Sequence, residues 1–117
     1  MLQQALDEFK SAFNKLSEAV ENYNKNLRDT KNKNWAKNVE SCRVKVKAAL
    51  EVAVAKLAKL TSALDQFKID AVKNAKMSKD GVFTLDDDAK RKVQQVEFWM
   101  NFAETTLETA ETITRVF

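Results

Sequence analysis

The chain has 117 residues, of which 44% are hydrophobic and 32% charged, and its formal net charge is +3 at pH 7. It holds no proline and a single glycine, Gly81, although sheets and tight turns depend heavily on these two residues. Composition therefore predicts an all-α protein, and the length predicts one domain, residues 1–117, that buries a core of its own.

The N-terminal segment carries the clearest periodic pattern in the chain. Its apolar residues follow one another at alternating spacings of four and three, the heptad form of the helical period that is typical of coiled coils. They are Leu2, Leu6, Phe9, Phe13, Leu16, Val20, Tyr23 and Leu27. Ala5, Ala12 and Ala19 flank this seam and are small enough for a neighbouring helix to approach closely. The pattern predicts a helix that is buried on one side and solvated on the other.

A polar segment, RDTKNKN at residues 28–34, interrupts this pattern. Asparagine and aspartate favour local side-chain hydrogen bonds over helix, so a turn between two helices is expected here. Thr30 or Asn34 is positioned to cap the helix that follows.

Residues 44–60 combine a helical pattern with a strand-like one. Every even position from Cys42 to Val54 is apolar, which is the alternation of a half-buried strand. Ala49, Ala53 and Ala55 break that alternation and favour a helix. A heptad seam also runs well past the strand-like part, through Val46, Leu50, Ala53, Leu57, Leu60, Leu64, Phe67 and Ala71. We interpret the stretch as a helix, and its apolar residues outside the seam predict that neighbouring segments cover it from several sides.

This second helix would be unusually long. Residues 35–77 would extend roughly 63 Å as one helix, against about 40 Å for the first helix, so it would overhang its neighbours. Thr61–Ser62 offers a break, because Ser62 and Asp65 form an acceptable N-cap pair. The seam crosses this site without a shift, however, and a hydroxyl can bond back to the preceding turn without breaking the helix. We predict an antiparallel bundle of three long helices, or of four if the chain breaks at Thr61–Ser62.

Residues 78–84 mark the next boundary. Gly81 suits the positive φ that often follows a helix end. Thr84 precedes Leu85 and three aspartates, a hydroxyl cap followed by carboxylates at the positive end of the helix dipole. These features predict a last helix over residues 85–117. Its seam is Ala89, Val93, Val96, Met100, Ala103, Leu107, Ala110 and Phe117.

The last helix also has a second apolar face. Phe98 and Phe102 lie four residues apart, on a face that points away from the seam. This face is flanked by Trp99, Ile113 and Val116 and continued by Thr105 and Thr109. Either a second neighbour buries it, or it is an exposed patch that binds a partner or another copy of the chain. The candidate partner-binding residues are Phe98, Trp99, Phe102, Thr105 and Thr109.

The strongest concentration of positive charge lies around the first turn. Between Lys25 and Lys47 there are eight lysines and arginines against Asp29 and Glu40, a net charge of +6. A basic loop of Lys31, Lys33 and Lys37 around Trp35 could bind nucleic-acid phosphates and stack a base, or lie on an anionic membrane surface. Alternatively, Trp35 covers the end of the core while the lysines keep the loop solvated.

Catalytic and metal-site patterns are missing from the sequence. With no histidine and one cysteine, it excludes Cys–His and Ser–His pairs, an internal disulfide, and zinc sites built from Cys and His. Glu104, Glu108 and Glu111 share a helical face that a solvated acidic surface explains. We expect no enzymatic activity, cofactor, metal or small-molecule substrate.

These observations favour a non-enzymatic protein–protein interaction module: a small adaptor, inhibitor or effector that occupies a partner's surface. The alternative is a bundle that binds lipid or an anionic polymer, and self-association stays open. Cys42 is expected to be buried, and a lone cysteine agrees with a reducing compartment. The N-terminus, MLQQALDEFK, is amphipathic and acidic rather than signal-like, which favours a cytoplasmic over a secreted location. No motif is specific enough to identify a family.

Overall fold

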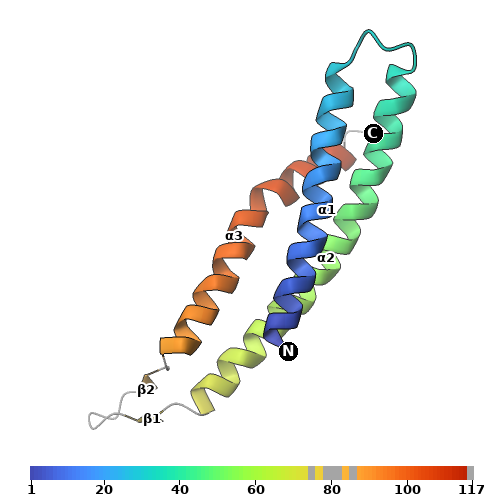
Figure 1. The fold of residues 1–117 in the computed structure, drawn as a ribbon. Helices are drawn as coiled ribbons and strands as arrows, with labels where there is room; N and C mark the ends of the chain where they lie inside the picture. The colour runs from blue at the N-terminus through green and yellow to red at the C-terminus, as the bar shows by residue number, and fades with distance from the viewer. Residues whose placement is uncertain (74–75, 78–82, 85–86, 116–117) are drawn as a thin grey trace.

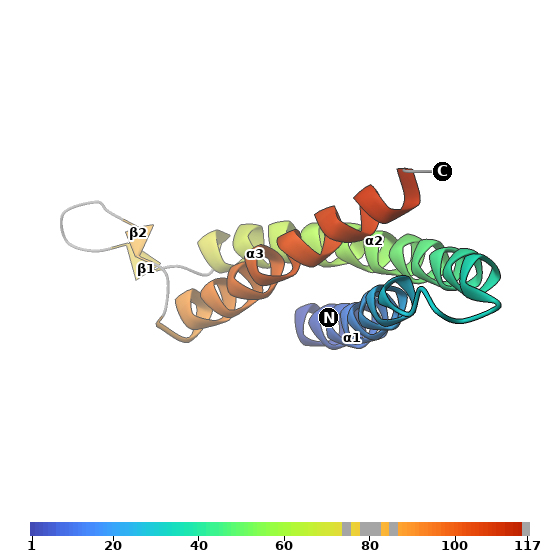
Figure 2. The ribbon, with the colours of Figure 1, turned by 90° about the horizontal axis from the view of Figure 1, so that it is seen from above.

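The computed structural model describes residues 1–73, 76–77, 83–84 and 87–115, which form three long helices and one short pair of strands. In chain order the elements are α1 (Leu2–Arg28), α2 (Trp35–Lys73), β1 (Lys76–Met77), β2 (Phe83–Thr84) and α3 (Asp87–Arg115). α1 and α2 form an antiparallel hairpin, and α3 runs obliquely beside it (Figures 1 and 2). The strands pair antiparallel, with Lys76 opposite Thr84. The predicted all-α, three-helix bundle is confirmed.

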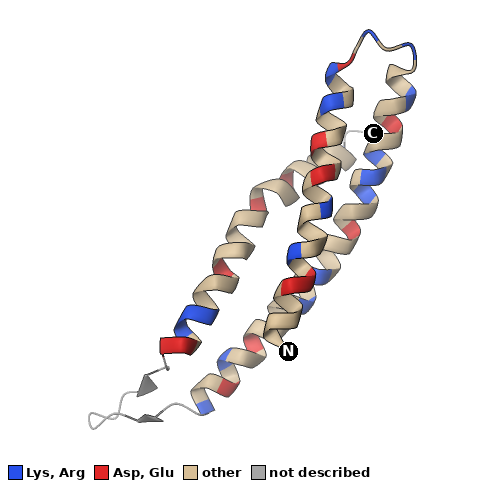
Figure 3. Ribbon diagram, in the orientation of Figure 1, with Lys and Arg blue, Asp and Glu red and all other residues tan. Residues whose placement is uncertain are grey.

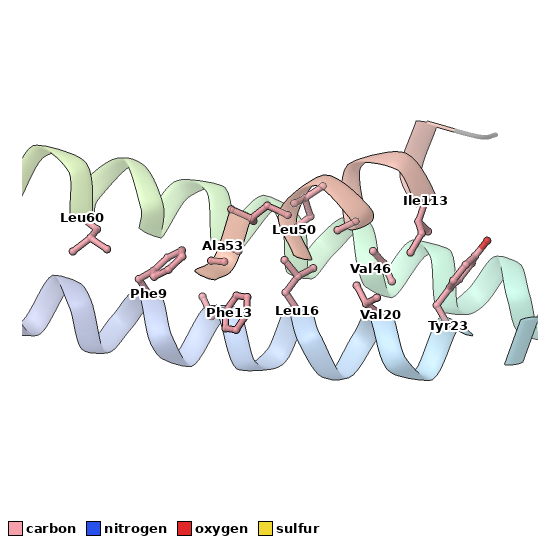
Figure 4. Packing of buried hydrophobic residues seen from close by; sticks show 14 of the residues in the cluster. Phe9, Phe13, Leu16, Val20, Tyr23, Val46, Leu50, Ala53, Leu60 and Ile113 are labelled. Atoms are coloured by element: carbon pink, nitrogen blue, oxygen red, sulfur yellow. The ribbon is translucent and has the colours of Figure 1, made fainter. Parts of the chain in front are cut away.

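The core lies between α1 and α2 and is completed by α3 (Figure 4). Seven of the eight seam residues of α1 are buried, which confirms the helical period predicted for this segment. The exception is Leu27, which is 40% exposed because it lies in the last turn, next to the connection to α2. Ala12 is buried, while Ala5 and Ala19 are half-buried against the core. These small side chains allow the close approach of the neighbouring helix.

α2 is a single helix of 39 residues, about 58 Å long. Of the two alternatives, three helices or four, the structure therefore shows three, and at the candidate break the Thr61 hydroxyl donates a hydrogen bond of 2.9 Å to the Leu57 carbonyl. The last turns of α2 and the first turns of α3 extend beyond the N-terminal end of α1 (Figures 1 and 2). The radius of gyration is accordingly 19.3 Å, whereas a compact domain of this length has about 13 Å.

One expectation for α2 is wrong. Five of the eight predicted seam residues are buried, with Val46, Ala53 and Leu60 fully inaccessible, and the other three are half-buried, but α2 is not covered from several sides. Val44 and Val52 are each at least half exposed, because α1 and α3 both pack against the seam side of α2. Within the described residues no other helix is present to cover the opposite side.

α3 follows its predicted seam but begins later than expected. Val96, Ala103, Leu107 and Ala110 are buried, as the heptad pattern predicts. Thr84 does not cap the helix, because it belongs to β2 and α3 begins at Asp87. Asp87 and Asp88 do lie in the first turn, where carboxylates oppose the positive end of the helix dipole. The expectations for Gly81, Leu85, Val116 and Phe117 lie outside the described residues.

Candidate interaction surfaces

The second apolar face of α3 is exposed. Phe98 is 64% and Phe102 56% accessible, so the interpretation of this face as a doubly covered core is wrong. We call Phe98, Trp99 and Phe102 the aromatic patch. Their side chains lie off the α3 seam, and the ring of Phe13 in α1 contacts Trp99 and Phe102.

The aromatic patch is an ordered stack rather than three independent rings. The rings of Phe98 and Phe102 are stacked, with centroids 6.1 Å apart and an interplanar angle of 14°. Phe102 also meets Trp99 and buried Phe13 edge to face, at 5.7 and 5.6 Å. Aromatic pairs of this geometry contribute about 0.5–1.5 kcal/mol each beyond the area they bury. The exposed rings are therefore held in place by the core beneath them.

Polar side chains border the aromatic patch. Lys10 of α1 places its Nζ 5.0 Å from the centroid of the Trp99 ring, in cation–π geometry. Thr105 and Thr109 are both exposed and continue the strip, and the Thr109 hydroxyl donates to the Thr105 carbonyl at 2.9 Å. Ile113, which the sequence suggested as a flank of this face, is instead buried in the core. Near the C-terminal end of α3, Ile113 therefore belongs to the same core cluster as Tyr23 of α1 (Figure 4).

The predicted basic loop forms one end of the bundle (Figure 3). Lys31, Lys33 and Lys37 are exposed around the turn at residues 29–34. The two carboxylates of this region are already engaged, because Asp29 accepts a hydrogen bond from the Asn32 amide at 3.3 Å. Glu40 likewise accepts one from Arg43 at 2.6 Å, and this bond lowers the pKa of Glu40, which stays ionised beside its cation.

The turn itself is fixed by local hydrogen bonds. The backbone amide of Asn34 donates to Oδ1 of Asn32 at 2.8 Å, and the amide of Trp35 donates to the Asn32 carbonyl at 3.1 Å. Asn34 occupies the N-cap position that the sequence suggested, because its carbonyl accepts from Asn38 at the start of α2. The polar segment thus folds as the local side-chain chemistry of asparagine predicts.

Trp35 has a structural role in this turn. Its Nε1–H donates to the Leu27 carbonyl at 3.0 Å, and its ring is half-buried against the core. The indole therefore closes the end of the α1–α2 hairpin, as one of the two sequence interpretations proposed. A ring fixed in this way is poorly placed to stack on a nucleic-acid base.

Replacing Trp35 by phenylalanine should lower the free energy of unfolding by about 1 kcal/mol, because the ring packing is largely kept while the hydrogen bond to Leu27 is lost. Urea denaturation followed by circular dichroism measures the difference. Lys33→Ala is the control, with an expected change within about 0.5 kcal/mol because its side chain is exposed. Equal stabilities for Trp35→Phe and wild type would show that the hydrogen bond contributes nothing.

A groove between α2 and α3 is a feature that the sequence did not reveal. It has a volume of about 380 Å³, and its lining includes the apolar residues Leu57, Met100 and Leu107 and the glutamates Glu104, Glu108 and Glu111. The sequence predicted that these glutamates form a solvated acidic face, and Glu104 and Glu108 are exposed. The groove arises because α3 runs obliquely to α2, which periodicity alone does not specify.

The single cysteine, Cys42, is buried, as expected. Its sulfur accepts a hydrogen bond from the side-chain amide of Asn22 at 3.5 Å.

In the part of the chain that the structure describes, no group of His, Cys, Asp or Glu is arranged to hold a metal ion, and no helix is apolar over a length that could cross a bilayer. Comparisons with family models, with curated proteins and with solved structures find no match.

Proposed function

We propose that this protein is a non-enzymatic protein–protein interaction module that binds its partner through the aromatic patch. The observation that carries the proposal is the exposure of two stacked phenylalanines, Phe98 and Phe102, above a buried aromatic residue, Phe13. Large apolar side chains exposed side by side are unusual on a monomer surface and typically mark an interaction site.

The arrangement of the patch supports a protein partner. Binding hot spots are rich in aromatic residues that enter pockets and exclude water, and rigid rings lose little side-chain entropy on binding. Lys10 beside Trp99 and the threonines Thr105 and Thr109 supply a polar rim, which is the usual anatomy of such an interface. The lysines at the end of the bundle would speed the approach of an acidic partner.

Capture from a lysate of the source organism tests this function. Wild type should retain at least one specific protein that Phe98→Glu/Phe102→Glu loses by tenfold or more, measured by quantitative mass spectrometry. Glutamate keeps the helix propensity of α3, so circular dichroism should show both proteins equally folded.

The matched control is Gln4→Glu/Ser11→Glu, which adds the same two carboxylates at exposed polar positions of α1. It should capture the same partner as wild type. An identical set of proteins captured by wild type and by the phenylalanine variant would contradict the proposed role of the aromatic patch.

Binding to an anionic polymer or membrane surface is the second candidate, and the exposed lysines at the basic end favour it. Such binding would weaken steeply between about 50 and 200 mM salt, because lysine contacts release counterions. Binding through the aromatic patch should change little over the same range. The fixed position of Trp35 supports the protein partner over base stacking.

A further inference from the structure

α2 carries a second heptad seam on the side away from the core, which we call the outer seam. It comprises nine positions at spacings of four and three, from residue 44 to residue 72, and all nine are exposed. Six of them are apolar: Val44, Ala48, Ala55, Ala58, Ile69 and Val72. The other three are Glu51, Ser62 and Asp65.

A helix that faces only water usually carries charged and polar residues on its outer side. The outer seam has the opposite character over a length of about 42 Å. Its central residues, Ala55 and Ala58, have the small side chains that let two helices approach closely. Val44 and Ile69, at 53% and 50% exposure, supply larger apolar groups near its two ends.

We infer that the outer seam pairs with the outer seam of a second copy of this chain, antiparallel, with Val44 opposite Ile69 of the second copy. In this register Ala55 faces Ala58 of the second copy, and Glu51 faces Ser62. A two-fold axis then lies midway between Ala55 and Ala58, and each contact occurs twice, as closed dimers require.

Charge complementarity selects this arrangement. The N-terminal half of the outer face is basic, with Lys45 and Lys47 flanking Ala48, and this register places Asp65 of the second copy opposite Ala48. Lys68 of the second copy lies near the same contact, and it forms an ion pair of 3.3 Å with Glu97 of its own chain. A parallel dimer would instead set Glu51 against Glu51 and Asp65 against Asp65, which costs energy through like-charge repulsion.

The charges that flank the seam favour this register on one side, although on the other side Lys47 faces Lys68 of the second copy, which is paired with Glu97 of its own chain. In the pairing of Val44 with Ile69, the flanking Lys45 faces Gln66 of the second copy. A shift of one heptad in either direction would place Lys45 against Lys59 or Lys73 of the second copy. An anionic membrane is a poorer occupant, because Glu51 and Asp65 lie in the middle of the apolar strip and would be repelled by the lipid headgroups.

Sedimentation equilibrium tests the dimer. Wild type should show twice the chain mass of 13.3 kDa, and Ala55→Glu should show the single mass, because two added carboxylates would enter the centre of the interface. Ala55 is exposed in the single chain, so circular dichroism should report unchanged helix content. Phe98→Glu/Phe102→Glu should remain dimeric, which separates this inference from the proposed function. A monomeric wild type at 100 µM or a dimeric Ala55→Glu would overturn the inference.

Disulfide cross-linking tests the register, in a Cys42→Ser background that removes the native thiol. A mixture of Val44→Cys and Ile69→Cys proteins should form a cross-linked dimer under mild oxidation. Val44→Cys alone should not, because in the antiparallel arrangement the two Val44 positions lie about 38 Å apart along the helices. Efficient cross-linking of Val44→Cys with itself, or none in the mixture, would overturn the antiparallel register.

Discussion

Replacing Phe9 by alanine is expected to lower the free energy of unfolding by about 3–5 kcal/mol, because a fully buried ring would leave a cavity between α1 and α2. Phe9 lies on α1 opposite the part of α2 between Ala53 and Leu60 (Figure 4). In an elongated bundle few other side chains surround such a ring, so the neighbouring residues cannot move far enough to fill the cavity. Urea or thermal denaturation followed by circular dichroism measures the loss, with an expected decrease of the melting temperature of roughly 10–20 °C.

Phe98→Ala is the matched control. It removes the same ring from a position that is 64% exposed, so its cost should stay below about 1 kcal/mol. If the two variants lost equal stability, Phe98 would have to be part of the core, and the aromatic patch would not be an exposed surface.

A second large effect is expected from Val46→Lys, because the introduced ammonium group would be buried in the apolar core without a partner. We expect the free energy of unfolding to fall by about 4 kcal/mol or more, a large part of the roughly 5–15 kcal/mol that holds a typical domain together. Urea denaturation followed by circular dichroism measures the loss.

Val44→Lys, two residues away, should retain the wild-type helix content, because Val44 is 53% exposed. The pair also distinguishes helix from strand at residues 44–54. In a strand the two valines would share one face, so both substitutions would be equally harmful or equally harmless. In a helix they lie on opposite sides, and only Val46 faces the core. Similar behaviour of the two variants would contradict the helix.

The sequence by itself determined the three helices and most of their buried positions. The spacing of Leu6, Phe9 and Phe13 specifies which side of α1 is apolar, because the period of a helix is a local property of the backbone. The same holds for Val46 and Ala53 in α2, where alanines outweighed the strand-like alternation. The unbroken seam favoured a continuous α2, but a break at Thr61–Ser62 stayed open until the structure showed one helix.

Only the tertiary structure decided which apolar faces remain exposed. Phe98 of α3 and Val44 of α2 are large apolar residues like those of the core, and another helix could have buried either of them. Both are exposed in the structure. Whether they are covered depends on where distant segments pack, and α1 and α3 both lie against one side of α2. The oblique course of α3, and with it the groove beside Leu57, likewise results from contacts between residues far apart in the chain. Such contacts leave no periodic trace in the sequence, because side-chain shape at the interface sets the angle between two helices.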